Sequence, residues 1–322
     1  MGIIHLAPVG RSPGAVTVPL VYLKRLYEEQ KTAGKRLEKS ILSPSLGNPA
    51  EAVVLFVSDD IKRGRKDATA YDDTIYNQYG RRNAKQQLKR DAHVIDVIAD
   101  FAKHELGDGK LSLYARVVNV EDFNNCFEAI AETAIALGRP DGLGKTLWAN
   151  ITGGTNILNA ALLEVTFLSG LISRLYYIFA EGDERRYMQP WTDQHQRFLE
   201  HWQDIPVMKT TFDERYRLIL LALAESNAAW DAQGLLDHLK QRSPERFDKI
   251  TLERFEKQWL RKMDRDLDVD ECTRQMRISE AGLEIVARME DKLFLTLVQR
   301  SDEPQVDMAA LRDKLEGYKV QL

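Results

Sequence analysis

Residues 146–169, TLWANITGGTNILNAALLEVTFLS, combine two structural patterns within one short stretch. The first part, 146–151, is a short apolar run typical of a buried strand, and 156–169 is an apolar segment long enough for a helix. Gly153 and Gly154 stand between them, and paired glycines favour a tight turn. The stretch therefore predicts strand, turn and helix, which is the repeating unit of a parallel sheet.

The same alternation runs through the first half of the chain. We expect further strands at 3–8, 52–57, 111–118 and 172–180, and helices at 16–29, 83–105 and 121–137. Strands that alternate with helices predict an α/β, Rossmann-like, doubly wound and mainly parallel sheet, and apolar strands indicate that helices cover both faces. Pro19 falls inside the first predicted helix, where it is tolerated only in the first turn.

The second half has a different pattern. Helices are expected at 212–226, 231–240 and 251–265, followed by a short strand at 273–278 and a helix that Ser279 caps. Three helices, a small hairpin and a helix are winged-helix order, a variant of helix-turn-helix. The second half is therefore expected to be an α-rich winged-helix domain.

This pattern divides the chain into four parts. We expect a ligand-binding domain at 1–190, a linker at 191–208, a winged helix-turn-helix domain at 209–300, and a polar C-terminal tail at 301–322 with one weak helix.

The bulk composition excludes several protein classes. The formal net charge is −4, so nothing in it demands nucleic acid or a membrane as partner. There is no run of about 18 apolar residues and no signal-peptide pattern at the start. Cys126 and Cys272 are typical of thiols in a reducing compartment. We expect a cytoplasmic protein without disulfides.

Two loops are the candidate ligand site, because ligands in such sheets bind at the carboxyl ends of the strands. Glycines allow close approach of the backbone, Arg11 suits a phosphate, and a helix N-terminus favours an anion. For each loop the alternative is a strand-to-helix turn that binds nothing. The candidate residues are Val9, Gly10, Arg11, Ser12, Pro13 and Gly14 in the first loop, and Thr152, Gly153, Gly154, Thr155 and Asn156 in the second.

A third segment near the same sheet edge is unusually rich in basic and tyrosine residues. It spans 62–82 and follows the strand predicted at 52–57. Basic and aromatic side chains together contact phosphates and stack on bases, although a solvated loop has the same composition. Further ligand-loop candidates are Tyr76 within this segment, and Ser58 and Asp59 between it and the strand.

No catalytic pattern is found. The first loop is not the GxGxxG of nicotinamide enzymes, and Gly144-Lys145-Thr146 lacks the earlier P-loop glycine because Arg139 stands there. The six histidines show no metal-ligand spacing. We therefore assign no catalytic residue, metal ion or cofactor.

The helix predicted at 251–265 would be the recognition helix of a winged helix. Its candidates for DNA contact are Arg254, Lys257, Arg261 and Lys262. Acidic residues are interspersed among them, so a protein-protein or dimerisation module is the alternative.

Two loop segments resemble the CARF family, the CRISPR-associated Rossmann-fold sensors. They are IIHLAPVGRSPGAV at 3–16 and WANITGGTNILNAAL at 148–162. The segment MRISEAG at 276–282 is similar to the strand-to-helix end of many winged helices. The resemblance implies a homodimer that binds cyclic oligoadenylate, usually cyclic tetra- or hexa-adenylate, in type III CRISPR antiviral defence. It implies ligand contacts at Gly10, Arg11, Ser12, Gly153, Gly154, Thr155 and Asn156.

Three functions follow as hypotheses. The first is a sensor, with cyclic tetra-adenylate as the expected ligand, whose winged helix binds double-stranded DNA as a transcriptional regulator. The second is a metal-independent ring nuclease, although many family members carry Lys or Arg where this chain has Asn156. The third is a ligand-activated nuclease whose catalytic residues, within 206–322, match no pattern recognised in the sequence. For the ligand site, we expect Gly154→Arg to abolish binding while leaving the fold intact.

Overall fold

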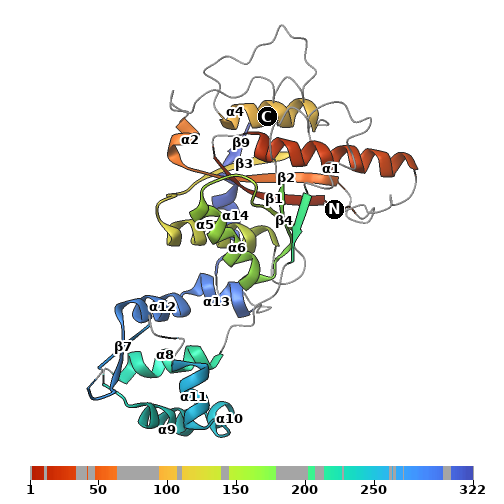
Figure 1. Cartoon of the computed structure of the whole chain (residues 1–322). Helices are drawn as coiled ribbons and strands as arrows, with labels where there is room; N and C mark the ends of the chain where they lie inside the picture. The colour runs from red at the N-terminus through yellow and green to blue at the C-terminus, as the bar shows by residue number, and fades with distance from the viewer. Residues whose placement is uncertain are drawn as a thin grey trace. The chain divides into compact units, whose positions relative to one another are not determined.

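Figure 1 shows the computed structural model of the chain. Two compact units are present, one formed by Met1–Thr210 together with Gln299–Leu322, and one by Thr211–Val298. The second unit is thus inserted into the chain of the first. The residues that the structure describes are 2–10, 13–33, 42, 48–63, 94–106, 111–138, 145–178, 202–206, 214–226, 228–260, 263, 266–270, 272–299 and 306–321.

The first unit is built on a seven-stranded sheet with the order β6-β5-β4-β1-β2-β3-β9. The five central strands are parallel, as predicted: β1 (Gly2–Val9), β2 (Asn48–Val57), β3 (Ser112–Val117), β4 (Thr146–Asn150) and β5 (Ile172–Ile178). The two outer strands, β6 (Trp202–Ile205) and β9 (Lys319–Val320), run antiparallel to their neighbours. The α/β, Rossmann-like prediction is confirmed.

Helices cover both faces of this sheet. In Figure 1, α1 (Gly14–Ala33) and α4 (Val94–Glu105) lie on one face, and α5 (Phe123–Gly138), α6 (Asn156–Ser169) and α14 (Met308–Glu316) lie on the other. A short helix, α2 (Asp59–Arg63), follows β2. The central strands β1, β2 and β4 are buried nearly throughout because helices cover both of their faces. The core against α1 and α4 includes Val16, Leu20, Leu55, Ile98 and Phe101.

Helix α1 begins earlier than predicted, which changes the position of Pro19. The helix starts at Gly14, and the N–H groups of Val16 and Thr17 both donate to the carbonyl of Pro13. Pro19 therefore lies in the second turn, and its expected place in the first turn was wrong. Because proline has no N–H, the carbonyl of Ala15 loses its partner four residues ahead in the helix.

The C-terminal segment is part of the sheet, which differs from the expected polar tail at 301–322. Helix α14 contacts α5 and β3, and β9 pairs with β3 through Leu113 opposite Val320. A strand of two residues has no readable alternation in sequence, so its pairing depends on the tertiary fold. The segment closes one edge of the sheet.

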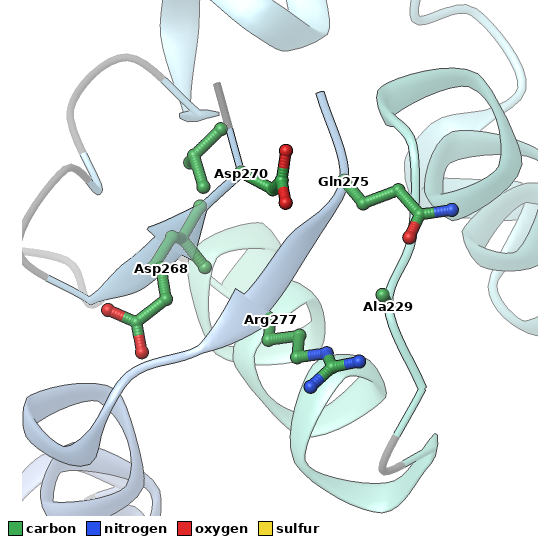
Figure 2. A pocket seen from close by; sticks show the side chains of 7 residues that line it. Ala229, Asp268, Asp270, Gln275 and Arg277 are labelled. Carbon is green, nitrogen blue, oxygen red and sulfur yellow. The ribbon is translucent and has the colours of Figure 1, made fainter. Parts of the chain in front are cut away.

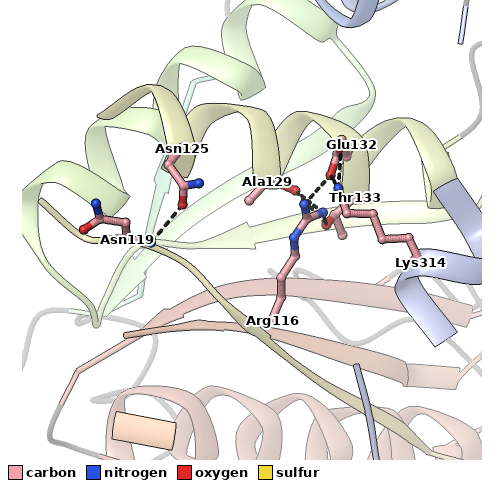
Figure 3. A network of polar contacts seen from close by, with 7 residues as sticks. All are labelled: Arg116, Asn119, Asn125, Ala129, Glu132, Thr133 and Lys314. Carbon is pink, nitrogen blue, oxygen red and sulfur yellow. Dashed lines mark hydrogen bonds and ion pairs between the residues drawn. The ribbon is translucent and has the colours of Figure 1, made fainter. Parts of the chain in front are cut away.

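A polar network holds this segment in place (Figure 3). Arg116 on β3 donates to the carbonyl of Ala129 at 2.8 Å and to the carboxylate of Glu132. Lys314 on α14 donates to the same carboxylate at 2.8 Å. Burial alone would raise the pKa of Glu132, but the hydrogen bonds from Lys314 and Arg116 outweigh it and hold that pKa below its ordinary value.

Glu132→Ala is expected to lower the free energy of unfolding by about 2 kcal/mol, because it leaves the buried guanidinium of Arg116 without its charged partner. Lys314→Ala is the matched control. The Lys314 side chain is 46% exposed, so its loss should cost less than about 1 kcal/mol. Urea unfolding of both variants checks this, and equal losses would contradict the central role of Glu132.

The second unit contains six helices within its described residues and one hairpin. The bounds are α8 (Glu214–Ser226), α9 (Ala232–Arg242), α10 (Pro244–Phe247), α11 (Leu252–Gln258), β7 (Leu267–Val269), β8 (Met276–Ile278), α12 (Glu280–Glu290) and α13 (Lys292–Gln299). Helix α11 is shorter than the helix predicted at 251–265. It ends where Trp259 leaves helical geometry and turns into the core with 6% of its surface exposed.

A third, very short segment pairs with the hairpin of β7 and β8. Strands β7 and β8 are antiparallel, and Trp230 forms a bridge with Met276 on the other side of β8. Ser279 caps α12 as predicted, since its hydroxyl accepts from the N–H of Gly282 at 3.1 Å. A Cβ on Gly282 would lie 2.5 Å from the carbonyl oxygen of Asp266, which explains the glycine at this helix start.

None of the helices in the described part of the chain is long and apolar enough to cross a lipid bilayer.

Candidate functional site: the loops after β1 and β4

The strand order of the sheet reverses at β1. This strand pairs with β2 on one side and with β4 on the other. The helices that follow β1 and β4, α1 and α6, lie on opposite faces of the sheet (Figure 1). Such a reversal leaves a crevice at the carboxyl ends of the two strands, which is where ligands bind in open α/β sheets.

The two loops are in contact through their backbones. A Cβ on Gly10 would lie 3.6 Å from the amide nitrogen of Gly154. A Cβ on Gly153 would lie 3.0 Å from both the Cβ of Ala15 and the carbonyl oxygen of Pro8. The glycines therefore allow one loop to pack on the other, a role that sequence reasoning did not assign to them.

Among the glycines of the two loops, Gly154 is the one whose position tolerates a side chain least. Its φ is +83°, in the left-handed region that side chains rarely adopt, and a Cβ would lie 2.4 Å from the Cβ of Pro8. A side chain there would point at Pro8, near the end of β1. The structure therefore gives a reason to expect that Gly154→Arg strains the backbone here as well as blocking the site, whereas the sequence alone predicted an intact fold.

Asn150 and Thr152 hold the second loop. The side-chain amide of Asn150 donates to the carbonyl of Ala15 at 2.9 Å, and its oxygen accepts from the N–H of Thr152 at 2.9 Å. The Thr152 hydroxyl accepts from the N–H of Ile178 at 3.0 Å and so ties the loop to the end of β5. Sequence reasoning missed Asn150, although a polar residue ending an apolar strand was the available signal.

The second loop ends at the start of α6. Thr155 is the N-cap, and its hydroxyl oxygen accepts from the N–H of Leu158 at 3.3 Å. The first N–H groups of a helix have no carbonyl within it to donate to, and the helix dipole adds positive potential there. Thr155 and Asn156 are exposed at this end, so the geometry suits an anion.

The predicted loop residues differ in how accessible they are. Gly10, Thr152, Gly153 and Gly154 are half-buried, whereas the side chain of Val9 is 2% exposed and belongs to the core. Pro13 and Gly14 are buried at the start of α1. Arg11 and Ser12 lie outside the described residues.

The third candidate segment has a local structural role where it is described. The Ser58 hydroxyl accepts from the N–H of Ile61 at 3.3 Å, and Asp59 pairs with Arg63 at 2.8 Å. Both contacts stabilise the short helix α2. Tyr76 lies outside the described residues.

His5 lies within β1, the strand that leads to the first loop, and only 1% of its surface is exposed. Its Nε2 is 2.7 Å from the carbonyl of Pro49, which can only accept, so Nε2 carries the hydrogen. The hydroxyl of Tyr176 then donates to Nδ1 at 3.1 Å. Burial lowers the pKa of His5 to about 4, and the hydrogen bond to Pro49 opposes this only in part. His5 is thus a neutral core residue.

In the second unit, the described DNA-contact candidates have partners on their own helix. The Nε of Arg254 donates to Gln258 at 3.0 Å, and Lys257 donates to Glu253 at 2.6 Å. Both basic side chains are exposed on α11. Arg261 and Lys262 lie outside the described residues.

The outer face of the hairpin forms a cleft of roughly 490 Å³ (Figure 2). Asp268 stands opposite Arg277 across the strands, and Asp270 adds a second carboxylate. Hydrogen bonds from Thr273 and Cys272 hold the pKa of Asp270 below its ordinary value. The face carries more acidic than basic groups and therefore does not suit phosphate.

Across the described ranges, no group of three or more His, Cys, Asp or Glu residues is arranged to hold a metal ion.

No family model matches the chain. An uncharacterized protein of Archaeoglobus fulgidus is 28% identical over 232 residues, which cover 64% of this chain and 68% of that protein. Among solved structures, Enterococcus italicus Csm6 bound to cyclic hexa-2'-fluoro-hexa-dAMP matches with a TM-score of 0.36 and 13% sequence identity. The match covers 81% of this chain and 55% of the Csm6 chain, so this chain spans little more than half the length of that protein.

Proposed function

We propose that this chain is a homodimeric sensor of cyclic oligoadenylate, with cyclic tetra-adenylate as its ligand. One observation carries the proposal. The two segments that resemble the CARF family, far apart in sequence, meet where the strand order reverses, with Gly10 against Gly154. This is the place where a sheet of this kind binds ligands.

The chemistry of the loops fits a phosphodiester ring. Phosphates suit the N-terminus of α6, and half-buried glycines allow the ligand to approach the backbone closely. A ring with two-fold symmetry suits a site shared by two copies of one chain, because both copies then offer the same loops.

The chemistry of the two loops favours binding of the ring without cleavage. The second loop, 152–156, contains no titratable side chain, and Asn156 offers hydrogen bonds without charge. A ring nuclease needs a group that activates the attacking 2′-oxygen. The described loop residues provide no such group, so the sensor is favoured over the ring nuclease.

A thermal-shift titration with cyclic tetra- and hexa-adenylate tests this assignment, followed by chromatography of the recovered ligand. A sensor should show a raised melting temperature with intact ligand. A shift with linear product would replace the sensor by a ring nuclease. No shift with either ring would overturn the assignment.

The output domain in this proposal is a winged helix. The order α8, the Trp230 bridge, α9, α11, β7 and β8 is the order of that fold, with α11 in the place of the recognition helix. The acidic hairpin face is a poor partner for phosphate, so the contact with double-stranded DNA falls to Arg254 and Lys257 on α11.

Replacing both residues, Arg254→Ala with Lys257→Ala, is expected to weaken duplex binding and reduce its salt dependence by about one unit of log–log slope per lost phosphate contact. Fluorescence anisotropy between about 50 mM and about 200 mM salt measures this slope. Arg242→Ala is the control and should leave the slope unchanged. It removes from α9 an exposed side chain that pairs with Glu225 of α8. Equal slopes for all three proteins would remove α11 from the DNA contact.

A further inference from the structure

Asn150 is a buried side chain with both ends of its amide in use. It is 2% exposed and ends β4, directly before the second loop. Its nitrogen donates to the carbonyl of Ala15 in the first turn of α1, and its oxygen accepts from the N–H of Thr152. One amide therefore joins the helix start that follows the first loop to the backbone of the second.

The partner carbonyl is available because of Pro19. In a regular helix the carbonyl of Ala15 accepts from the N–H of residue 19, and proline has none. A partly buried carbonyl without a partner costs stability, so the amide of Asn150 satisfies a group that α1 itself leaves open. Pro19 and Asn150 therefore act as a pair, although 131 positions separate them in the sequence.

We propose that Asn150 is a positioning residue for the ligand, which sets the spacing between the two loops, and that Pro19 reserves the Ala15 carbonyl for it. The proposal rests on the function proposed above. The role needs a side chain that donates and accepts at once over a short reach. An aspartate at this position accepts from Thr152 but has no donor for Ala15, so only an amide of this length fits.

A cycle of variants tests the pairing without any ligand. Asn150→Ala should lower the melting temperature by about 4 °C, because it leaves the partly buried Ala15 carbonyl without a donor. In a Pro19→Ala background the new N–H of residue 19 can serve that carbonyl, so the same change should cost about half as much. An equal loss in both backgrounds would overturn the pairing.

Ligand affinity then separates positioning from mere stability. Calorimetry with cyclic tetra-adenylate should show a dissociation constant at least about tenfold higher for Asn150→Ala. The double variant with Pro19→Ala should show the same increase, because it does not restore the bond between the loops. Wild-type affinity in the double variant would overturn the positioning role.

Asn125→Ala is the matched control. Asn125 also accepts from a backbone N–H after a parallel strand, that of Asn119 at 2.8 Å (Figure 3). That strand is β3, which is separated from β1 by β2 in the sheet. Asn125→Ala should leave affinity unchanged, and a loss equal to that of Asn150→Ala would count against a specific role for Asn150. If the unaltered protein binds no ring, the proposed function and the positioning role fall together, while the stability cycle still decides the pairing.

Discussion

Gly154→Ala is expected to lower the free energy of unfolding by about 3 kcal/mol, a larger effect than any other single methyl group should have in the two loops. The residue has a φ of +83°, and the added Cβ would lie 2.4 Å from the Cβ of Pro8. The second loop must then move away from the end of β1. Ligand affinity should fall at least about tenfold, because the contact between the loops is lost.

Gly10→Ala is the control for this prediction. The same methyl group at Gly10 would lie 3.6 Å from the nitrogen of Gly154, which is ordinary van der Waals contact. Its free energy of unfolding should change by less than about 1 kcal/mol. Chemical denaturation of both variants measures the difference, and similar losses would show that the contact between Gly154 and Pro8 does not hold the loop.

Acid should destabilise the first unit through His5. The pKa of this group is lowered from 6.5 to about 4 in the folded chain. Between these values the unfolded chain binds a proton that the folded chain does not, so stability falls as pH falls. The stability that neutral His5 contributes is fully present above about pH 6.5, and about 3 kcal/mol of it is lost by about pH 4.

His5→Gln checks the cause. Glutamine retains a donor and an acceptor at this position but does not titrate in this range. Denaturant unfolding at steps from about pH 7 to about pH 4 should therefore show a shallower decline for the variant than for the unaltered chain. Parallel curves for the two proteins would contradict a buried, neutral His5.

The central sheet and α6 were predictable because their signals are local. Five apolar runs alternate with helical segments, and α6 has the predicted bounds, Asn156–Ser169, because paired glycines precede it and Gly170 ends it in the left-handed conformation. The outer strands β6 and β9 were not predicted. They have four and two residues, and their positions depend on the edges that β5 and β3 offer.

In the candidate site, sequence reasoning found the glycines but not their full role. Two glycines after a strand predict a turn, whereas the direction of a missing Cβ appears only once Pro8 and Gly154 are placed in space. Likewise, Pro19 was recognised as unusual in a helix, but its partner Asn150 belongs to a strand far along the chain. Helix α11 ends early because Trp259 is needed in the core, which no local pattern indicates.

The loops after β1 and β4 are proposed to bind a cyclic oligoadenylate shared between two chains. Calorimetric titration of the full chain with cyclic tetra-adenylate, beside linear tetra-adenylate of the same composition, tests this binding most directly. The ring should bind saturably at one ring per two chains, and the linear form should bind much more weakly. No binding of the ring, or equal binding of both forms, would contradict this proposal.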